Sequence, residues 1–346
     1  MKRRIIIMYM ALMLLTGCSG RSAGWQTGNV TLVRAVGVDR GQAGVMLTAW
    51  GGAAERLTAE GSSVAEGVQK LQAMGDSFVH FGHADQLLLG EEFARDGTAQ
   101  LVDFVARDRQ IGPGARLWVL RGGQKTGETN VAVRLERLAG DRESGAKLDC
   151  SVTGLMSAMA REGSVAVPAL RWEEDQLQPA GYAVLRQGRL VGFLDGEQSL
   201  GLELLRGQSE GQTADITLPD TQPLILSVRR ADIQCIPRLD AGRLVGAAVT
   251  CEAEFEVIQG ARLSVGQRQE AERQAEEALS RRLVAALAFA QFWDADFAGV
   301  EQMLRMACSP REWSGVDWER DFRTLSLQAA VSAEINWPAD MAEDGR

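Results

Sequence analysis

The sequence has few of the residues on which catalytic, metal-binding and disulfide-braced proteins depend. Its 346 residues include only two histidines and five cysteines. Two histidines are too few for a metal site made of several imidazoles, and they leave few choices for the histidine of a catalytic triad. The hydrophobic and charged fractions, 45% and 24%, are those of a globular protein that is stabilised by an ordinary core.

Positive charge is also scarce. The chain carries 37 Lys and Arg against 46 Asp and Glu, which gives a formal charge of −9. Three of the basic residues are Lys2, Arg3 and Arg4, so removal of the leader predicted below changes −9 to about −12. A protein this acidic has no electrostatic attraction for nucleic acid or for anionic lipid.

The apolar run near the start is too short to cross a membrane. Ile5–Leu15 has eleven residues, whereas a helix that spans about 30 Å of hydrocarbon needs nearly twice as many. The basic residues before this run and the small residues after it predict a secretory signal over residues 1–17. Leu15-Thr16-Gly17-Cys18 resembles the lipobox of bacterial lipoproteins, which implies cleavage before Cys18 and lipidation of its thiol. The alternative is an ordinary signal peptide with an unrelated cysteine.

Lipidation of Cys18 would place the protein on a membrane without a spanning helix. Two or more acyl chains give stable anchoring, where one chain gives only reversible binding. Residues 18–29 are rich in Ser and Gly and are expected to form a flexible tether. The sequence therefore predicts a lipid-anchored, extracytoplasmic protein.

The other four cysteines are predicted to be buried and unbridged. Only Cys235 and Cys251 are close in sequence, on either side of a hairpin whose turn lies near 240–243. That turn places Cys235 opposite Ala248, about 10 Å along the strand from Cys251. A disulfide requires Cα atoms within about 7 Å. We therefore expect small apolar side chains at these positions, including Cys150 and Cys308.

The length of the chain predicts two domains, at 30–205 and 215–346, joined by a polar linker at 206–214. In the first domain, residues alternating at a period of two predict strands, and a capping box at Ser63–Glu66 predicts the start of a helix. The elements expected there are strands at 30–38, 45–50, 78–89 and 117–120, helices from 63, from 91 and at 130–140, and a hairpin at 182–194.

The second domain is predicted to hold strands at 223–235, 244–258 and 325–335 and a helix at 264–292. The buried face of that helix is expected to consist of Leu279, Leu283, Leu287, Val284, Ala288 and Phe292. Strands and helices mix without a strict βαβ rhythm, which predicts an α+β fold. We expect mixed sheets with flanking helices in two or three small units, with the long C-terminal helix packed on an antiparallel sheet.

The motifs that suggest chemistry have simpler explanations. Gly207–Gly211 matches the G-x-S-x-G nucleophile elbow at Ser209, but it lies in a polar segment and no histidine follows it. His80 and His83, with Asp85, suggest a metal site. In a strand, however, positions 80 and 83 point to opposite faces, which favours structural histidines.

The remaining candidates are charged and aromatic clusters. Residues 173–175, Glu-Glu-Asp, are expected to be a solvated charge run. Trp293, Trp313, Trp318 and Phe322 could stack on sugars, but their spacing favours closure of a core. No residue set predicts a metal, a cofactor or a catalytic group.

The order of several short segments resembles the Ger(x)C family, the lipoprotein subunits of spore germinant receptors. The segments that carry this resemblance are Arg34–Asp39, Phe81–His83, Leu87–Glu92, Ala94–Gly97, Asp103-Phe104, Arg107-Asp108, Gly181–Val184, Leu190–Leu194, and, near the C-terminus, Asp296, Pro310, Trp313, Trp318 and Phe322. One position departs from the family pattern. The family often has Trp-Asp directly after the lipidated cysteine, whereas here Trp25 comes later and Gln26 follows it.

The resemblance implies a non-enzymatic subunit on the outer face of a spore's inner membrane, beside two membrane-spanning receptor subunits. It carries over no ligand-binding residue and no cofactor. A second interpretation is a lipoprotein that binds a solute or an envelope polymer for another system. A third, an anchored hydrolase, lacks an assembled nucleophile and base.

Overall fold

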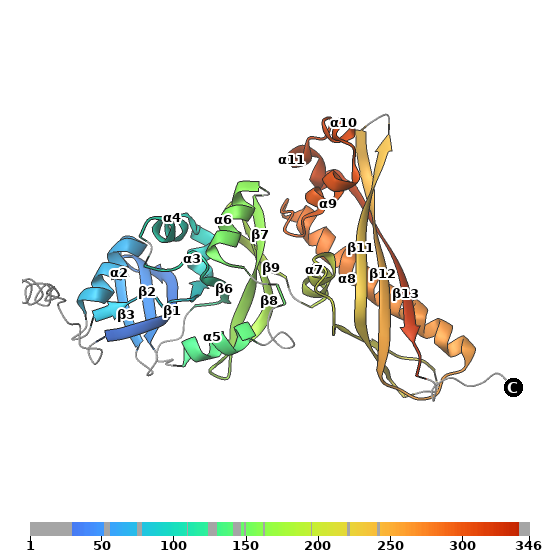
Figure 1. Ribbon diagram of the computed structural model, residues 1–346, viewed down its shortest axis with the longest axis horizontal. Coiled ribbons are helices and arrows are strands. Elements are labelled where there is room, and N and C mark those ends of the chain that lie inside the picture. Colours follow the sequence, from blue (N-terminus) through green and yellow to red (C-terminus); the bar gives the residue numbers. More distant parts are fainter. Residues whose placement is uncertain are drawn as a thin grey trace, which may run out of the picture.

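The computed structural model describes residues 30–338, apart from 52–55, 75–77, 109, 124–129, 141–146, 149, 162, 195, 220–221 and 241–242. The predicted signal, the tether and Cys18 lie outside the described residues. Two β-sheets organise this part of the chain into an N-terminal and a C-terminal unit (Figure 1). None of the helices in these residues is both long and apolar enough to span a membrane.

The N-terminal sheet is mixed. Its strands are β1 (Val30–Gly41), β2 (Gly44–Gly51), β3 (Arg56–Gly61), β4 (Phe78–His80), β5 (Gln86–Gly90), β6 (Arg116–Arg121), β7 (Ser164–Glu173), β8 (Gln176–Arg186) and β9 (Arg189–Leu194). The order is β3-β2-β1-β5-β6-β7-β8-β9, and β4 pairs with β1. β1, β5, β6 and β7 run parallel, and antiparallel hairpin strands extend both sides of this centre.

Helices cover both faces of the N-terminal sheet. They are α2 (Val64–Ala73), α3 (Glu91–Asp96), α4 (Ala99–Asp108), α5 (Val131–Gly140) and α6 (Val152–Arg161). Leu87 and Leu89 join the core under α2, α3, α4 and α6, whereas Leu88 joins the core under α5. A strand buried on both faces must be apolar at successive positions, and β5 is.

The C-terminal sheet has the order β10-β11-β12-β13. Its strands are β10 (Thr213–Ile216), β11 (Leu224–Asp240), β12 (Arg243–Gln259) and β13 (Ser326–Asn336). The helices of this unit are α7 (Glu197–Leu205), α8 (Val265–Phe292), α9 (Val300–Ala307), α10 (Pro310–Trp313) and α11 (Trp318–Asp321), followed by the 3₁₀ turn η2 (Phe322–Thr324).

The predicted α+β class is confirmed, but the C-terminal sheet is not wholly antiparallel. β10, β11 and β12 pair antiparallel, whereas β13 lies parallel to β12. The reason is α8, which follows β12 in the chain and precedes β13. It runs back along the sheet, so that β13 begins at the same end of the sheet as β12 (Figure 1).

Only half of the predicted buried face of α8 is correct. Leu279, Leu283 and Leu287 are buried, but Val284 is 51% exposed and Phe292 is 75% exposed. Besides Arg282, the rest of the buried face consists of alanines, which are Ala271, Ala275, Ala278, Ala286 and Ala290. Small side chains at these positions let α8 approach the sheet and α7 closely. At the tightest point, a Cβ built on Gly201 of α7 would lie 1.9 Å from the Arg282 carbonyl oxygen of α8.

Several predicted boundaries also differ. The expected strand at 78–89 is two strands joined by a turn, and the helix expected from Glu91 is broken into α3 and α4 by Gly97, whose φ is +125°. β3 and α7 were not predicted. The predicted linker, 206–214, connects α7 to β10 and includes the first two residues of that strand.

The two units share a core where they meet. Tyr182, Val184 and Leu194, from β8 and β9, pack with residues of α7, α8 and the C-terminal sheet. The ion pair between Arg186 of β8 and Asp294, just after α8, also bridges the units. The N-terminal sheet thus packs against α7 and α8, so the two units are joined by contacts as well as by the chain.

Candidate functional site

The two histidines lie side by side on the surface, and the predicted opposite orientation is wrong. The reason is that β4 ends at His80, so His83 lies in the turn that follows. Their ring centroids are 5.9 Å apart, and both side chains are exposed. His80 Nδ1 accepts a hydrogen bond from the Gly82 N–H at 3.2 Å. Within the described residues, no group of three potential ligands is assembled that could hold a metal.

Ser209 lies in the turn between α7 and β10, not at a nucleophile elbow. An elbow follows a strand and precedes a helix, whereas here a helix precedes the serine and a strand follows it. Ser209 is only 3% exposed, so its hydroxyl is not presented to a substrate. The match to G-x-S-x-G therefore carries no catalytic geometry.

A buried polar network joins the two units near this turn. The Tyr182 hydroxyl donates to Glu203 Oε1 at 2.7 Å, and Gln212 Nε2 donates to Glu203 Oε2 at 3.0 Å. Arg282 donates to Gln212 Oε1 at 3.1 Å and to the Thr213 carbonyl at 2.6 Å. These residues come from β8, α7, the turn, β10 and α8, so no local sequence pattern indicates the network.

Burial governs the protonation of this network. It raises the pKa of Tyr182 far above its ordinary value, and the charge of Glu203 acts in the same direction. It also lowers the pKa of Arg282, an effect that Glu197 opposes from 3.6 Å. The network holds the two units together through these buried hydrogen bonds.

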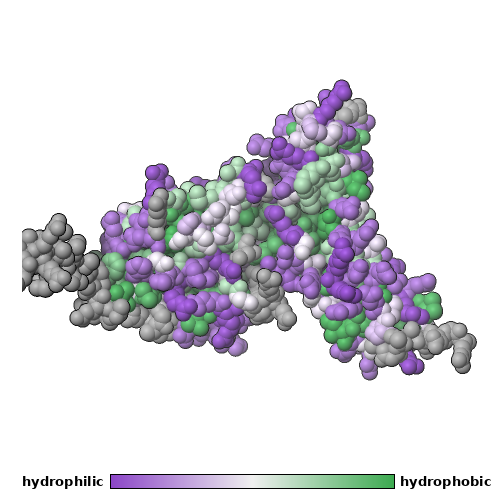
Figure 2. Space-filling model, viewed as in Figure 1, coloured by the Kyte–Doolittle hydropathy of each residue, from purple (hydrophilic) through white to green (hydrophobic). Residues whose placement is uncertain are grey.

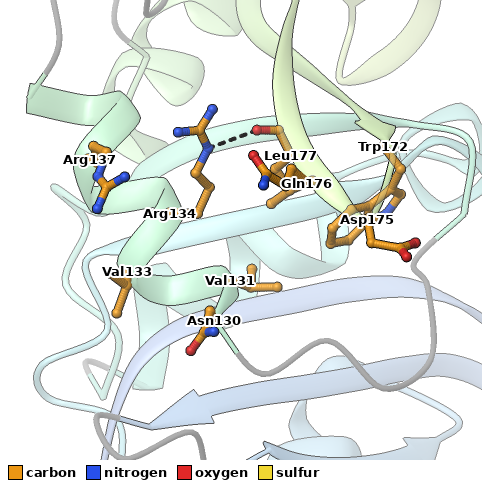
Figure 3. A pocket seen from close by; sticks show the side chains of 9 residues that line it. All are labelled: Asn130, Val131, Val133, Arg134, Arg137, Trp172, Asp175, Gln176 and Leu177. Carbon is orange, nitrogen blue, oxygen red and sulfur yellow. Dashed lines mark hydrogen bonds between the residues drawn. The ribbon is translucent and has the colours of Figure 1, made fainter.

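The first surface hollow lies between α5 and the β7–β8 hairpin and has a volume of about 580 Å³ (Figure 3). Arg134 spans it, donating from Nε to the Leu177 carbonyl at 2.9 Å and from one terminal nitrogen to Gln178 Oε1 at 3.0 Å. These bonds clamp α5 to the hairpin. Arg137 lies on the same helix, and Trp172 and Asp175 lie on the hairpin side.

The hairpin turn beside this hollow explains the charge run at 173–175. Glu173 pairs with Gln176 across the turn, and Glu174 and Asp175 have φ values of 44° and 66°. Two successive positive φ values are typical of a two-residue type I′ turn. The run is therefore a turn, and the hollow holds no nucleophile with a base beside it.

The second hollow is a cleft between the units, with a volume of about 800 Å³. One wall comes from the end of α6 and from β8, with Met159, Arg161 and Arg186. The other comes from α9, α10, α11 and η2. In Figure 2, hydrophilic side chains gather where the two units meet. The cleft requires both units, so no single segment of sequence predicts it.

The predicted aromatic cluster forms part of this cleft. Trp313 and Trp318 have ring centroids 6.2 Å apart, and Trp318 stacks on Phe322 at 4.9 Å. Phe322 is buried, but both tryptophans are only partly buried and line the cleft. The prediction that they close a core is therefore half right. Trp293 is 38% exposed and contacts Phe292 at the end of α8, outside this cleft.

The carboxylates of the cleft outnumber its arginines. Asp294, Asp296, Glu301, Asp317 and Glu319 line it, against Arg161 and Arg186. Arg186 pairs with Asp294, and Asp296 accepts the N–H groups of the first turn of α9 at 2.7–2.9 Å. By formal charge, five carboxylates against two arginines give the lining of the cleft a negative excess.

The four described cysteines are buried and free, as predicted. Cys235 faces Val249 rather than Ala248, because a bulge between Arg238 and Leu239 shifts the register. Burial raises the pKa of Cys235 to about 11 and that of Cys251 to about 12. Neither thiol is an activated nucleophile.

Known protein families match most of the chain. The family described as "Spore germination protein N-terminal domain" matches residues 29–171, and the family described as "Spore germination B3/ GerAC like, C-terminal" matches residues 180–338. The crystal structure of the GerBC protein is similar, with a TM-score of 0.57 and 16% identity over 88% of this chain and 98% of that chain. At this identity the likeness concerns the fold. No curated protein sequence matches.

Proposed function

This chain is a member of the GerAC-like family of spore germination proteins, and we propose that it is the lipid-anchored, non-enzymatic subunit of a spore nutrient germinant receptor. The observation that carries the proposal is the succession of the two family domains along residues 29–171 and 180–338. The solute- or envelope-binding lipoprotein is the alternative that the experiments below must separate from it.

The described surface supports a role in binding rather than catalysis. The sequence-based candidates for chemistry, His80, His83 and Ser209, form no site in the described part of the chain. The α5 hollow and the cleft between the units are lined by arginines, carboxylates and aromatic rings, with no nucleophile activated by a neighbouring base. A subunit of this kind would act by contact with membrane-spanning receptor subunits.

We propose that Cys18 carries the anchor, after removal of residues 1–17. From Cys18 to Val30 an extended chain reaches about 40 Å at most, so the N-terminal unit would stay close to the membrane surface. Confinement there raises the effective concentration of the protein at its partners, and modest contacts then suffice for a complex. The predicted domains, 30–205 and 215–346 joined by 206–214, remain part of the proposal, although α7 (Glu197–Leu205) packs with the C-terminal unit.

Fractionation of spores tests the anchor. Cys18→Ala should release the protein from the membrane fraction and remove its acyl chains in a mass spectrum. Cys308→Ala is the matched control, because Cys308 lies in the folded part of the C-terminal unit and should not affect anchoring. An unmodified wild-type protein that begins at a residue other than Cys18 would overturn the lipoprotein assignment.

A germination assay tests the receptor role. Deletion of the gene should abolish the response to one set of nutrients, while growth and responses through other receptors persist. Membrane-spanning subunits should copurify with the wild-type protein from spores. Normal germination on every nutrient tested, with no copurifying membrane protein, would favour the solute-binding alternative.

A further inference from the structure

We propose that the cleft between the two units binds a small organic cation with an apolar part, such as an alkylammonium group. This inference does not depend on the receptor role, because it rests on the shape and chemistry of the cleft alone. With a volume of about 800 Å³, the cleft falls within the range of small-molecule sites, which often lie between domains.

The apolar part of the ligand would lie on the aromatic wall. Trp313 and Trp318 line the cleft while remaining partly exposed, and Met159 and Val316 line it as well. Phe322 stacks beneath Trp318 at 4.9 Å and fixes the position of that ring. Rigid aromatic rings contribute a large contact area with little loss of side-chain entropy.

The sign of the charge follows from the lining. Arg186, one of its two arginines, is paired with Asp294, and by formal charge five carboxylates of the lining outnumber the two arginines. Glu319 is exposed at the cleft, whereas Asp317 accepts the Arg320 backbone N–H at 3.4 Å and pairs with the Arg320 guanidinium at 3.5 Å. An anionic ligand would be repelled, and an uncharged ligand would gain nothing from these charges. A cation gains from both the carboxylates and the adjacent aromatic rings.

Three probes of four carbons each separate charge from apolar contact. Butylammonium, 1-butanol and butyrate are titrated by calorimetry, at low salt, into the full-length protein in detergent, with detergent buffer as the blank. We expect saturable binding of butylammonium, at least about fivefold tighter than that of butanol. Butyrate should bind more weakly than either.

Two variants then locate the site. Trp318→Leu should weaken butylammonium by about threefold or more. Glu319→Gln, on an exposed side chain, should leave the fold intact and weaken only butylammonium, by about two- to fivefold. Glu252→Gln makes the same charge change on β12, outside the cleft, and should have no effect.

The outcomes that overturn the proposal are distinct. Equal affinity for butylammonium and butanol, or tighter binding of butyrate, would refute the assignment of a cation. Butylammonium binding that is unchanged in both Glu319→Gln and Trp318→Leu would place the site elsewhere. Absence of saturable binding would refute the site itself, with no bearing on the anchor or on the germination assay.

Discussion

The two sheets of this protein bury their strands in different ways. In the N-terminal sheet the central strands β5 and β6 are covered on both faces, and Leu87, Leu88 and Leu89 are all fully buried. In the C-terminal sheet α8 covers one face, and β13 alternates between partly buried and exposed residues. The first arrangement requires continuous apolar runs, and the second requires alternation.

This difference determines where a substitution is felt. A residue in β5 or β6 contacts a core whichever way it points. Over most of β11, β12 and β13, covered residues alternate with residues that face solvent, as Asp232, Gln234 and Glu252 do. Substitutions in the central strands of the N-terminal sheet should therefore all lower the free energy of unfolding. In the C-terminal sheet the loss should depend on whether the residue lies on the covered or the exposed face.

The largest effect is expected at Trp118, in the centre of β6. It is 2% exposed, and its indole N–H donates to Gln86 Oε1 at 2.7 Å. Trp118→Ala should lower the free energy of unfolding by about 3–5 kcal/mol, because it creates a cavity and leaves the buried Gln86 amide without its donor. Guanidinium denaturation measures this. A loss below about 1 kcal/mol would contradict the two-sided burial of β6.

A neighbouring pair on α8 tests the one-sided burial of the C-terminal unit. Leu283 is fully buried, whereas Val284 is 51% exposed. Leu283→Ala should cost about 2–5 kcal/mol. Val284→Ala should change the free energy of unfolding by about 0.5 kcal/mol or less, as is usual for surface positions. Equal losses at the two positions would mean that Val284 is covered, as the helical spacing of the apolar residues predicted.

The network between the units should show a smaller effect. Tyr182→Phe removes the hydroxyl that donates to Glu203 at 2.7 Å and accepts from the Leu148 N–H at 3.2 Å. Glu203 and the Leu148 N–H then each lose a hydrogen-bond partner, which should lower the free energy of unfolding by about 1–3 kcal/mol. Thermal unfolding of Tyr182→Phe measures the loss. Glu210→Gln, on an exposed side chain of the adjoining turn, is the control and should unfold as the wild type does.

The same contrast explains how far the sequence could be interpreted. The hairpin of β11 and β12, the long helix and the one-sided strand β13 were all predicted, because period-two and helical patterns persist over many residues there. Between 141 and 180 the sequence predicts no helix or strand. Its strands β7 and β8 lie in a proline-containing stretch, and their apolar runs have no clear period.

The sites were less predictable than the elements. Trp313 and Trp318 were recognised as a cluster, but their role as one wall of a cleft depends on Arg161 and Arg186, which come from the other unit. Glu203, Gln212 and Arg282 meet only because α7, the following turn and α8 pack together. Local patterns indicate which face of an element is buried, but they do not indicate which distant side chain completes a site.

The smallest effect concerns pH and the inner face of the C-terminal sheet. Burial raises the pKa of Cys251 to about 12, above its ordinary value of 9.0, and Asp232 and Glu252 add to this. Since the folded protein holds the proton more tightly, the related stability is fully present below about pH 9 and is lost as the pH rises towards 12.

Cys251→Ala removes this pH-dependent contribution. The wild type should therefore lose more stability than the variant between pH 7 and pH 10.5, with a difference on the order of 1 kcal/mol. Urea denaturation at a series of pH values measures, for each of the two proteins, the slope of the free energy of unfolding against pH. A Val284→Ala variant, altered on the exposed side of α8, should keep the wild-type slope. Identical slopes for wild type and Cys251→Ala would show that the inner face of this sheet is accessible to water, which would remove the contrast between its two faces.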